Sequence, residues 1–187
     1  MFIHVLAGGL IFFIFGLLNS WKWNSWKMAI GYIFFGAFVG LFPDILSFLL
    51  CGKITTGKWS HKHRDNISHS LFLPLAVFCI FIFWNWRWAT LLSLTTLTHP
   101  LLDLFGIGWG VKLFYPFSQT TYKLFYKGKI INAFTQEEID KEAEKYGDEY
   151  WKKNIYDIIH SFNIIGALEW FFLLVFIALL VMVYISY

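Results

Sequence analysis

Charged residues are scarce in this chain of 187 residues, since only 14% of them are Asp, Glu, Lys or Arg. Hydrophobic residues make up 58% of the chain and aromatic residues 22%. A soluble domain of this length could not remove so much apolar surface from water. The formal net charge of +3 is too small to predict nucleic-acid binding. The composition therefore predicts an integral membrane protein whose main solvent is the lipid bilayer.

Cysteine is almost absent. Cys51 and Cys79 form no Cys-x-x-Cys pair, which argues against a disulfide scaffold and a zinc ribbon and predicts two small buried hydrophobic residues. The N-terminus lacks Lys and Arg before the first apolar run, and no small-x-small cleavage site follows that run. We therefore expect this run to be a retained helix and not a cleaved signal peptide.

Five apolar segments determine the predicted fold. They are residues 2–18, 28–50, 71–84, 89–105 and 163–187. A spanning helix needs about 20 residues to cross about 30 Å of hydrocarbon. The fifth segment meets this requirement easily, whereas the third and fourth are short for a span. We expect an all-α, polytopic membrane bundle of about five transmembrane helices.

The connectors predict the orientation of the bundle. The two long connectors, residues 51–69 and 106–162, contain twelve of the fifteen Lys and Arg residues. Positive charge favours the cytoplasmic side, so the sequence predicts a multi-pass inner (plasma) membrane protein with a cytoplasmic N-terminus and an external C-terminus. We divide the chain into a membrane-embedded domain at 1–120, a cytoplasmic or interfacial connector at 121–162 and a C-terminal transmembrane helix at 163–187.

The second long connector is expected to form a helical hairpin. Thr135 and Glu138 have the spacing of a capping box at the start of a helix over residues 136–146, and Gly147 is a candidate C-cap. A second short helix is predicted over residues 148–160. An amphipathic pair of this kind is typical of the membrane surface.

Ionisable residues near the ends of the apolar segments are candidates for function because such groups are costly in a membrane. With the predicted topology, all of them fall on the cytoplasmic side. They are His4, Asp44, His61, His63, His69, His99, Asp103 and His160. Taken singly, His4, His61 and His160 are more simply interfacial polar residues, and Asp44 after Pro43 could be a helix cap or turn former.

His99 and Asp103 are four residues apart, so one face of a helix carries both. His63 and His69 flank a short loop that could fold both imidazoles towards the same centre. Imidazole and carboxylate ligands together suit a divalent metal, most simply zinc, with manganese or iron as alternatives. The competing interpretation is a buried hydrogen-bond network that holds the bundle together. The glycines at 8, 9, 36 and 40 predict helix-packing contacts, and the hydroxyls of the fourth segment predict interhelical hydrogen bonds.

These motifs resemble those of the YdjM-like family of inner-membrane proteins, to which metal-dependent hydrolase activity is ascribed. The resemblance covers residues 1–120 and rests on five motifs in order: His4, Phe42-Pro43-Asp44, His63 to Ser70, His99-Pro100-Leu101-Leu102-Asp103, and Gly108 through Tyr115-Pro116. Ser68 stands where threonine is common in the family. The His and Asp usage is also remotely similar to that of zinc-dependent phospholipase C and P1 nuclease, which implies phosphoester hydrolysis.

The leading prediction is therefore a metal-dependent hydrolase at the cytoplasmic membrane face. Its expected metal ligands are His4, Asp44, His63, His69, His99 and Asp103, and its expected catalytic residues are Asp44, His69 and Arg64. Arg64 could pair with a substrate phosphate or, equally, with lipid headgroups. The expected partners are membrane lipid and a phosphoester or lipid-linked phosphate. The alternative is a non-catalytic membrane protein with a structural metal site, or a cation- or proton-conducting bundle, although a pathway predicts ionisable groups through the depth of the membrane.

Overall fold

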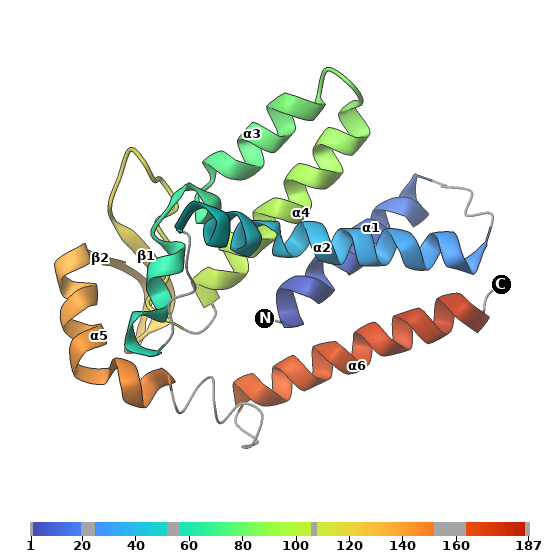
Figure 1. Ribbon diagram of the computed structural model, residues 1–187. Helices are drawn as coiled ribbons and strands as arrows, with labels where there is room; N and C mark the ends of the chain where they lie inside the picture. Colours follow the sequence, from blue (N-terminus) through green and yellow to red (C-terminus); the bar gives the residue numbers. More distant parts are fainter. Residues whose placement is uncertain (1, 20–24, 52–56, 106–107, 152–163, 186–187) are drawn as a thin grey trace.

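Helices dominate the computed structural model, which describes residues 2–19, 25–51, 57–105, 108–151 and 164–185 (Figure 1). The chain begins with α1 (Phe2–Leu18) and α2 (Trp26–Cys51) and continues through two 3-10 helices, η1 (Gly57–Arg64) and η2 (Ile67–His69). A helical pair follows, α3 (Phe72–Phe81) and α4 (Trp86–Phe105). The last elements are a strand pair, β1 (Thr121–Tyr126) and β2 (Lys129–Phe134), then α5 (Gln136–Trp151) and α6 (Ile164–Ile185).

The apolar segments form helices with nearly the predicted bounds, but five transmembrane helices are not shown. Within the described residues, α2 is the one helix that is long and apolar enough to be a candidate span. The helix α3 has ten residues, so it rises about 15 Å and covers about half of the hydrocarbon thickness. The third segment is shorter than predicted because its C-terminal residues form the turn that leads into α4.

Close glycine contacts bring α1 against α2. A Cβ atom added to Gly36 would lie 2.5 Å from the carbonyl oxygen of Gly8, and one added to Gly40 would lie 2.6 Å from that of His4. Such approach is available only without side chains, and it is a common way to pack helices in membranes. The predicted packing role of these glycines is therefore confirmed. The contact also fixes the start of α1 beside the C-terminal half of α2.

Large hydrophobic side chains point outward from the helices. Six that are at least half exposed are Ile14, Phe34, Phe38, Leu75, Ile80 and Leu174. A surface of this kind is suited to lipid and not to water. Cys51 and Cys79 are also exposed, so the prediction that they are buried is wrong. A small apolar side chain on a lipid-facing helix has no need of burial within the protein.

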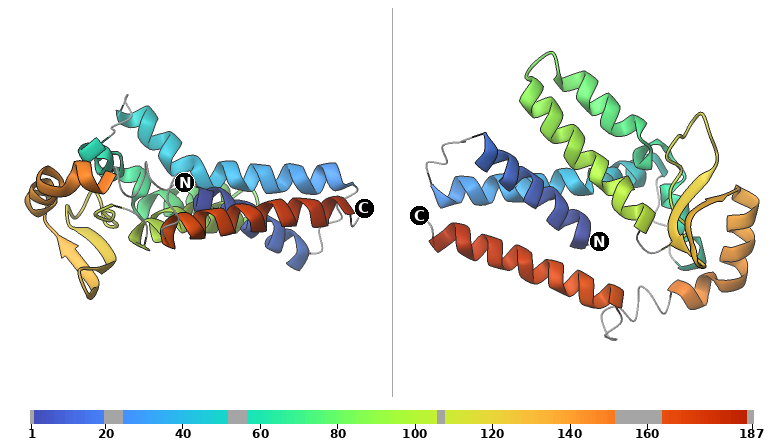
Figure 2. Two further views of the ribbon diagram at one scale, coloured as in Figure 1. Left: turned by 90° about the horizontal axis from the view of Figure 1, so that it is seen from below. Right: turned by 180° about the vertical axis from the view of Figure 1, so that it is seen from behind.

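The connector before α5 contains a two-stranded antiparallel sheet, so the all-α prediction is wrong in this region. The chain reverses at Lys127 and Gly128, whose φ angles are 48° and 79°, as a two-residue hairpin turn requires. The sheet, η1 and α5 lie together at one end of the molecule, where the sheet projects to one side of the long helices (Figure 2).

The helix α5 confirms the predicted capping box but not the predicted end. The Glu138 carboxylate accepts from the Thr135 backbone N–H at 2.8 Å, and the Thr135 hydroxyl accepts from the Glu138 N–H at 3.3 Å. Gly147 lies inside the helix and is buried. It is not among the glycines of the described residues that have a positive φ, so it forms no left-handed C-cap. Most of the predicted second helix, residues 152–160, lies outside the described residues.

Most hydroxyl groups along α4 do not form the interhelical hydrogen bonds that the sequence predicts. Thr90, Thr95 and Thr96 donate to the carbonyl four residues earlier in the same helix. Ser93 does cross to the neighbouring helix, where it donates to the Pro74 carbonyl at 2.9 Å. The prediction of interhelical hydrogen bonds is therefore wrong for these threonines, because a helical threonine reaches its own backbone more easily than a neighbouring helix.

Candidate metal centre

Four elements bring five of the predicted ligands together at the end of the bundle next to η1. His4 is in the first turn of α1, Asp44 is near the end of α2, His69 ends η2, and His99 and Asp103 are in the last turns of α4. His69, His99 and Asp103 are 0%, 1% and 2% exposed. Asp44 lies inside α2, so it is not the helix cap or turn former considered as an alternative.

Two imidazoles and two carboxylates form the centre of this cluster. Asp44 Oδ1 lies 3.2 Å from His69 Nε2 and 3.4 Å from His99 Nε2. Asp103 Oδ2 lies 3.7 Å from His69 Nε2 and 3.6 Å from His99 Nε2. Ligand atoms around a tetrahedral zinc ion are about 3.3 Å apart, because each lies about 2.0–2.1 Å from the metal. Two overlapping triads have all their ligand atoms within 4.8 Å of one another: Asp44 with His69 and His99, and His4 with His99 and Asp103. Each triad could hold a small divalent cation.

The orientation of the imidazoles is set by their other nitrogens. His99 Nδ1 donates to the Gly40 carbonyl at 2.7 Å, so the Nε2 lone pair of neutral His99 points into the cluster. His69 Nδ1 lies 2.8 Å from the Ser68 hydroxyl. Ser68 is held in turn by Asn66, whose side-chain oxygen accepts from the Ser68 N–H at 2.9 Å. Partners of this kind are what metal-binding histidines generally have.

The two carboxylate oxygens of Asp103 have different surroundings. Oδ1 accepts from Arg64 Nη2 at 2.9 Å and lies 3.5 Å from His4 Nε2. Oδ2 is buried and has no hydrogen-bond partner among the described residues. A bare buried carboxylate oxygen is costly unless a proton or cation meets it. This atom therefore fits the donor set of a cation site better than that of a closed hydrogen-bond network.

His4 forms a second triad of candidate ligand atoms with His99 and Asp103, whereas His63 and His61 lie further out. The His4 ring stacks on that of His99, with centroids 3.9 Å apart, and lies on the Arg64 side of Asp103. His63 is at the mouth of the cluster, with Nε2 3.7 Å from Asp44 Oδ1. His61 lies away from it, edge-on to Trp109 and 3.9 Å from an Asp140 oxygen. His160 lies outside the described residues.

Burial sets the charge of His69, which lies outside the long helices. Desolvation lowers the pKa of His69 to about 4, although its contact with Asp44 opposes this change. The ring is therefore neutral at about pH 7 and can act as a ligand. Basic groups surround the cluster on the η1 and β1 side. Lys123 is 4% exposed, and burial together with the charge of Arg64 lowers its pKa to about 8.

Sequence reasoning missed three of the residues that shape this site. Gly40 contributes a carbonyl oxygen, which leaves no trace in a side-chain pattern. Lys123 is on a strand that was expected to be part of a helical connector. Ser68 carried a usable signal, because an Asn-x-Ser segment such as Asn66 to Ser68 favours a turn in which the asparagine oxygen accepts from the backbone two residues later.

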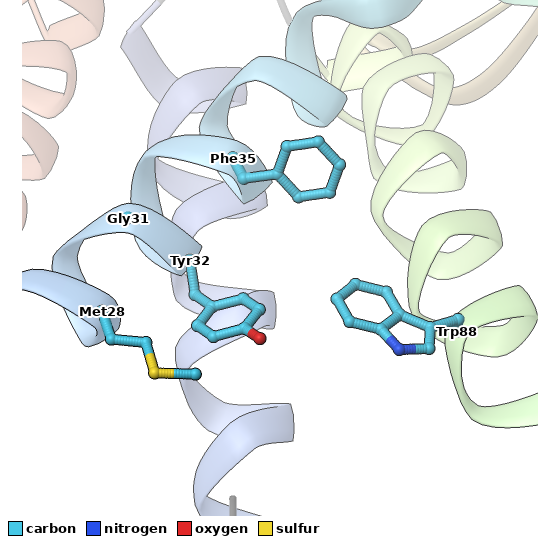
Figure 3. Close-up of a pocket in the computed structure, with 5 residues that line it drawn as sticks. All are labelled: Met28, Gly31, Tyr32, Phe35 and Trp88. Atoms are coloured by element: carbon cyan, nitrogen blue, oxygen red, sulfur yellow. The ribbon is translucent and has the colours of Figure 1, made fainter. Parts of the chain in front are cut away.

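A separate apolar pocket lies towards the other end of the long helices. Its volume is about 420 Å³, and it is lined by Met28, Gly31, Tyr32, Phe35 and Trp88 (Figure 3). The first four belong to α2 and Trp88 belongs to α4. None of the clustered His and Asp residues lines this pocket, so it is separate from the candidate metal centre.

Comparison with known families gives a match over the whole chain. The family model of the YdjM inner membrane protein matches residues 1–187. This chain belongs to the YdjM inner membrane protein family. The match confirms the resemblance inferred from the motifs of residues 1–120 and extends it to the connector and to α6, and it supports an inner-membrane location. No curated protein and no solved structure matches the chain. The remote similarity to phospholipase C and P1 nuclease therefore stays a prediction.

Proposed function

We propose that this member of the YdjM family is a membrane-bound, metal-dependent hydrolase that acts on a phosphoester of a lipid or a lipid-linked substrate at the cytoplasmic face. The observation that carries the proposal is a pair of overlapping triads whose ligand atoms lie within 4.8 Å of one another: Asp44 with His69 and His99, and His4 with His99 and Asp103. A bound metal would supply a water of lowered pKa and would polarise a phosphoryl oxygen.

The residues around the candidate metal ligands suit this chemistry. His63 is close enough to Asp44 to be a further ligand, and its side chain is 32% exposed at the mouth. Arg64 keeps Asp103 in place through its contact with Oδ1. Arg64 and Lys123 add positive charge beside the cluster, which would favour a phosphate-bearing substrate. Apolar side chains on the outside of the helices support a substrate that would approach the site from the bilayer.

Metal content measured by elemental mass spectrometry on detergent-purified protein tests the proposal. We expect near-stoichiometric zinc, manganese or iron in the wild type and little in His69→Ala or Asp103→Asn. His61→Ala is the matched control, because it removes an imidazole that lies outside the centre and should leave the metal in place. Size-exclusion profiles confirm that each variant is folded.

Turnover is tested next with metal-loaded protein and phospholipid or lipid-linked phosphate substrates. Release of phosphate or a headgroup that requires both metal and Asp103 supports the hydrolase. Wild-type protein that stays metal-free after reloading contradicts the proposal. Metal binding without turnover on any phosphoester favours the alternative, a structural metal site. Conduction is less favoured, because the clustered acids and histidines lie at one end of the bundle.

A further inference from the structure

The tip of the β1–β2 hairpin presents apolar side chains outside the protein core. Phe125, Ile130 and Ile131 are 67%, 67% and 69% exposed. Ile131 pairs with Leu124 across the ladder, and Ile130 therefore points to the opposite face. Exposed apolar side chains thus lie on both faces of the strand beside the turn, while the turn contacts Glu142 of α5 through Tyr126 and Lys127. Packing against one further protein surface would leave one of these apolar faces in water. Insertion into a medium that surrounds the tip covers both.

The hairpin is continuous with the lipid-facing surface of the helices. Phe125 packs against Phe105, the last residue of α4, with ring centroids 5.9 Å apart. Phe105 is 59% exposed, in line with the outward apolar surface of the bundle. Close by in the chain, Phe117 packs against Phe72, the first residue of α3, at 5.0 Å. These contacts lie at the same end of the antiparallel α3–α4 pair (Figure 1).

Positive charge flanks the apolar tip. Lys129 is exposed and begins β2, and Lys127 forms the turn, where its ammonium group contacts Glu142 of α5 at 2.7 Å. Lysine beside exposed aromatic and aliphatic residues is typical of segments in the headgroup layer, because the stem packs on apolar groups while the charge stays near phosphate.

We infer that the tip of the β1–β2 hairpin is a membrane anchor that inserts into the headgroup layer of the bilayer. The partner is a lipid surface with anionic headgroups. Anchoring holds β1, and with it Lys123, against the end of α4 that carries Asp103. The anchor does not depend on whether the metal centre performs hydrolysis.

A fluorophore at the tip tests this arrangement. Ile131→Cys is made in a background of Cys51→Ser and Cys79→Ser, labelled with an environment-sensitive dye, and reconstituted into vesicles of phosphatidylcholine and anionic phosphatidylglycerol. The matched control is Glu144→Cys, an exposed position on α5. We expect the dye at 131 to be quenched by a headgroup nitroxide lipid and to be roughly twofold less accessible to aqueous iodide than the dye at 144.

Two results would overturn the inference. Equal quenching of both positions by iodide means that the tip is in water. Protection of position 131 from both quenchers means that protein covers it, either a partner or a second copy of this chain. The same measurement at Ile130→Cys, on the opposite face of the strand, guards against a local effect of one label, because insertion predicts lipid contact at both positions.

Discussion

The contacts of the Nδ1 atoms of His69 and His99 determine which nitrogen each ring presents to the candidate metal centre. His99 is fixed by a backbone carbonyl, which mutation cannot remove. His69 depends on the Ser68 hydroxyl, which can be removed with a small change of volume. Ser68 is fully buried, where its hydroxyl lies against this ring and its backbone N–H donates to the Asn66 side chain. This difference makes Ser68 the more informative position.

Ser68→Ala is expected to weaken metal binding roughly tenfold, because loss of the orienting partner frees the His69 ring. The measurement is competition with a chromogenic chelator on purified protein. Ser93→Ala is the control, because it removes a partly buried hydrogen bond to the Pro74 carbonyl. This bond joins α4 to α3, away from the candidate metal centre. Equal affinity of Ser68→Ala and wild-type protein would show that the hydroxyl does not position a ligand.

Residue spacing predicted only part of the site. The interval between His99 and Asp103 placed both on one helix face, and their ligand atoms do lie 3.6 Å apart. No local pattern could place His4 against His99, because that contact depends on how closely α1 approaches α2. The role of Arg64 was also open in the sequence, since its contact with Asp103 joins residues from η1 and α4.

Among the elements, the α1–α2 pair sets the geometry of the centre. Gly36 lies at the crossing, where an added Cβ would lie 2.5 Å from the Gly8 carbonyl and 2.7 Å from the Phe12 ring. Gly31, on the same helix, has nothing within 4 Å of such an atom. A methyl group added at Gly36 would clash with α1, whereas one added at Gly31 would not. The two positions therefore make a matched pair for a glycine-to-alanine substitution.

Gly36→Ala is expected to lower the free energy of unfolding by about 1–3 kcal/mol, because the helices must separate to admit the methyl group. Metal occupancy should fall as well, since His4 and Gly40 move with them. Gly31→Ala should be neutral or slightly stabilising, as alanine favours a helix over glycine. Thermal unfolding in detergent, with metal content measured alongside, compares the variants. A Gly36→Ala protein as stable as Gly31→Ala would contradict the close crossing.

Helical elements were more predictable than the strands. Long apolar runs fixed α1, α2 and α4 to within a few residues, because only a helix satisfies its own backbone in lipid. The β1–β2 hairpin was missed although residues 121–126 are rich in aromatic side chains and Lys127-Gly128 is a turn signal. Its lysines were interpreted only as part of a charged connector. The actual pattern is a ladder with exposed apolar side chains beside a Lys-Gly turn.

At the scale of the whole molecule, the clustered His and Asp residues lie at the same end as η1, the β1–β2 sheet and α5 (Figure 1). The turn between α3 and α4 lies at the far end of that helical pair (Figure 1). The positive-inside rule predicts that the end with η1, α5 and the metal centre faces the cytoplasm. The family shows an inner-membrane location, and the orientation within that membrane is a separate prediction.

Labelling with a membrane-impermeant maleimide determines the orientation. In the background without Cys51 and Cys79, Arg87→Cys reports on the α3–α4 turn and Glu144→Cys reports on α5; both positions are exposed. We expect Arg87→Cys to react in intact spheroplasts and Glu144→Cys to react only after the membrane is permeabilised, because the basic connectors remain on the cytoplasmic side. The opposite pattern would place the metal centre on the external face. A substrate of the site would then have to be sought among lipids of the outer leaflet, even if the metal chemistry were unchanged.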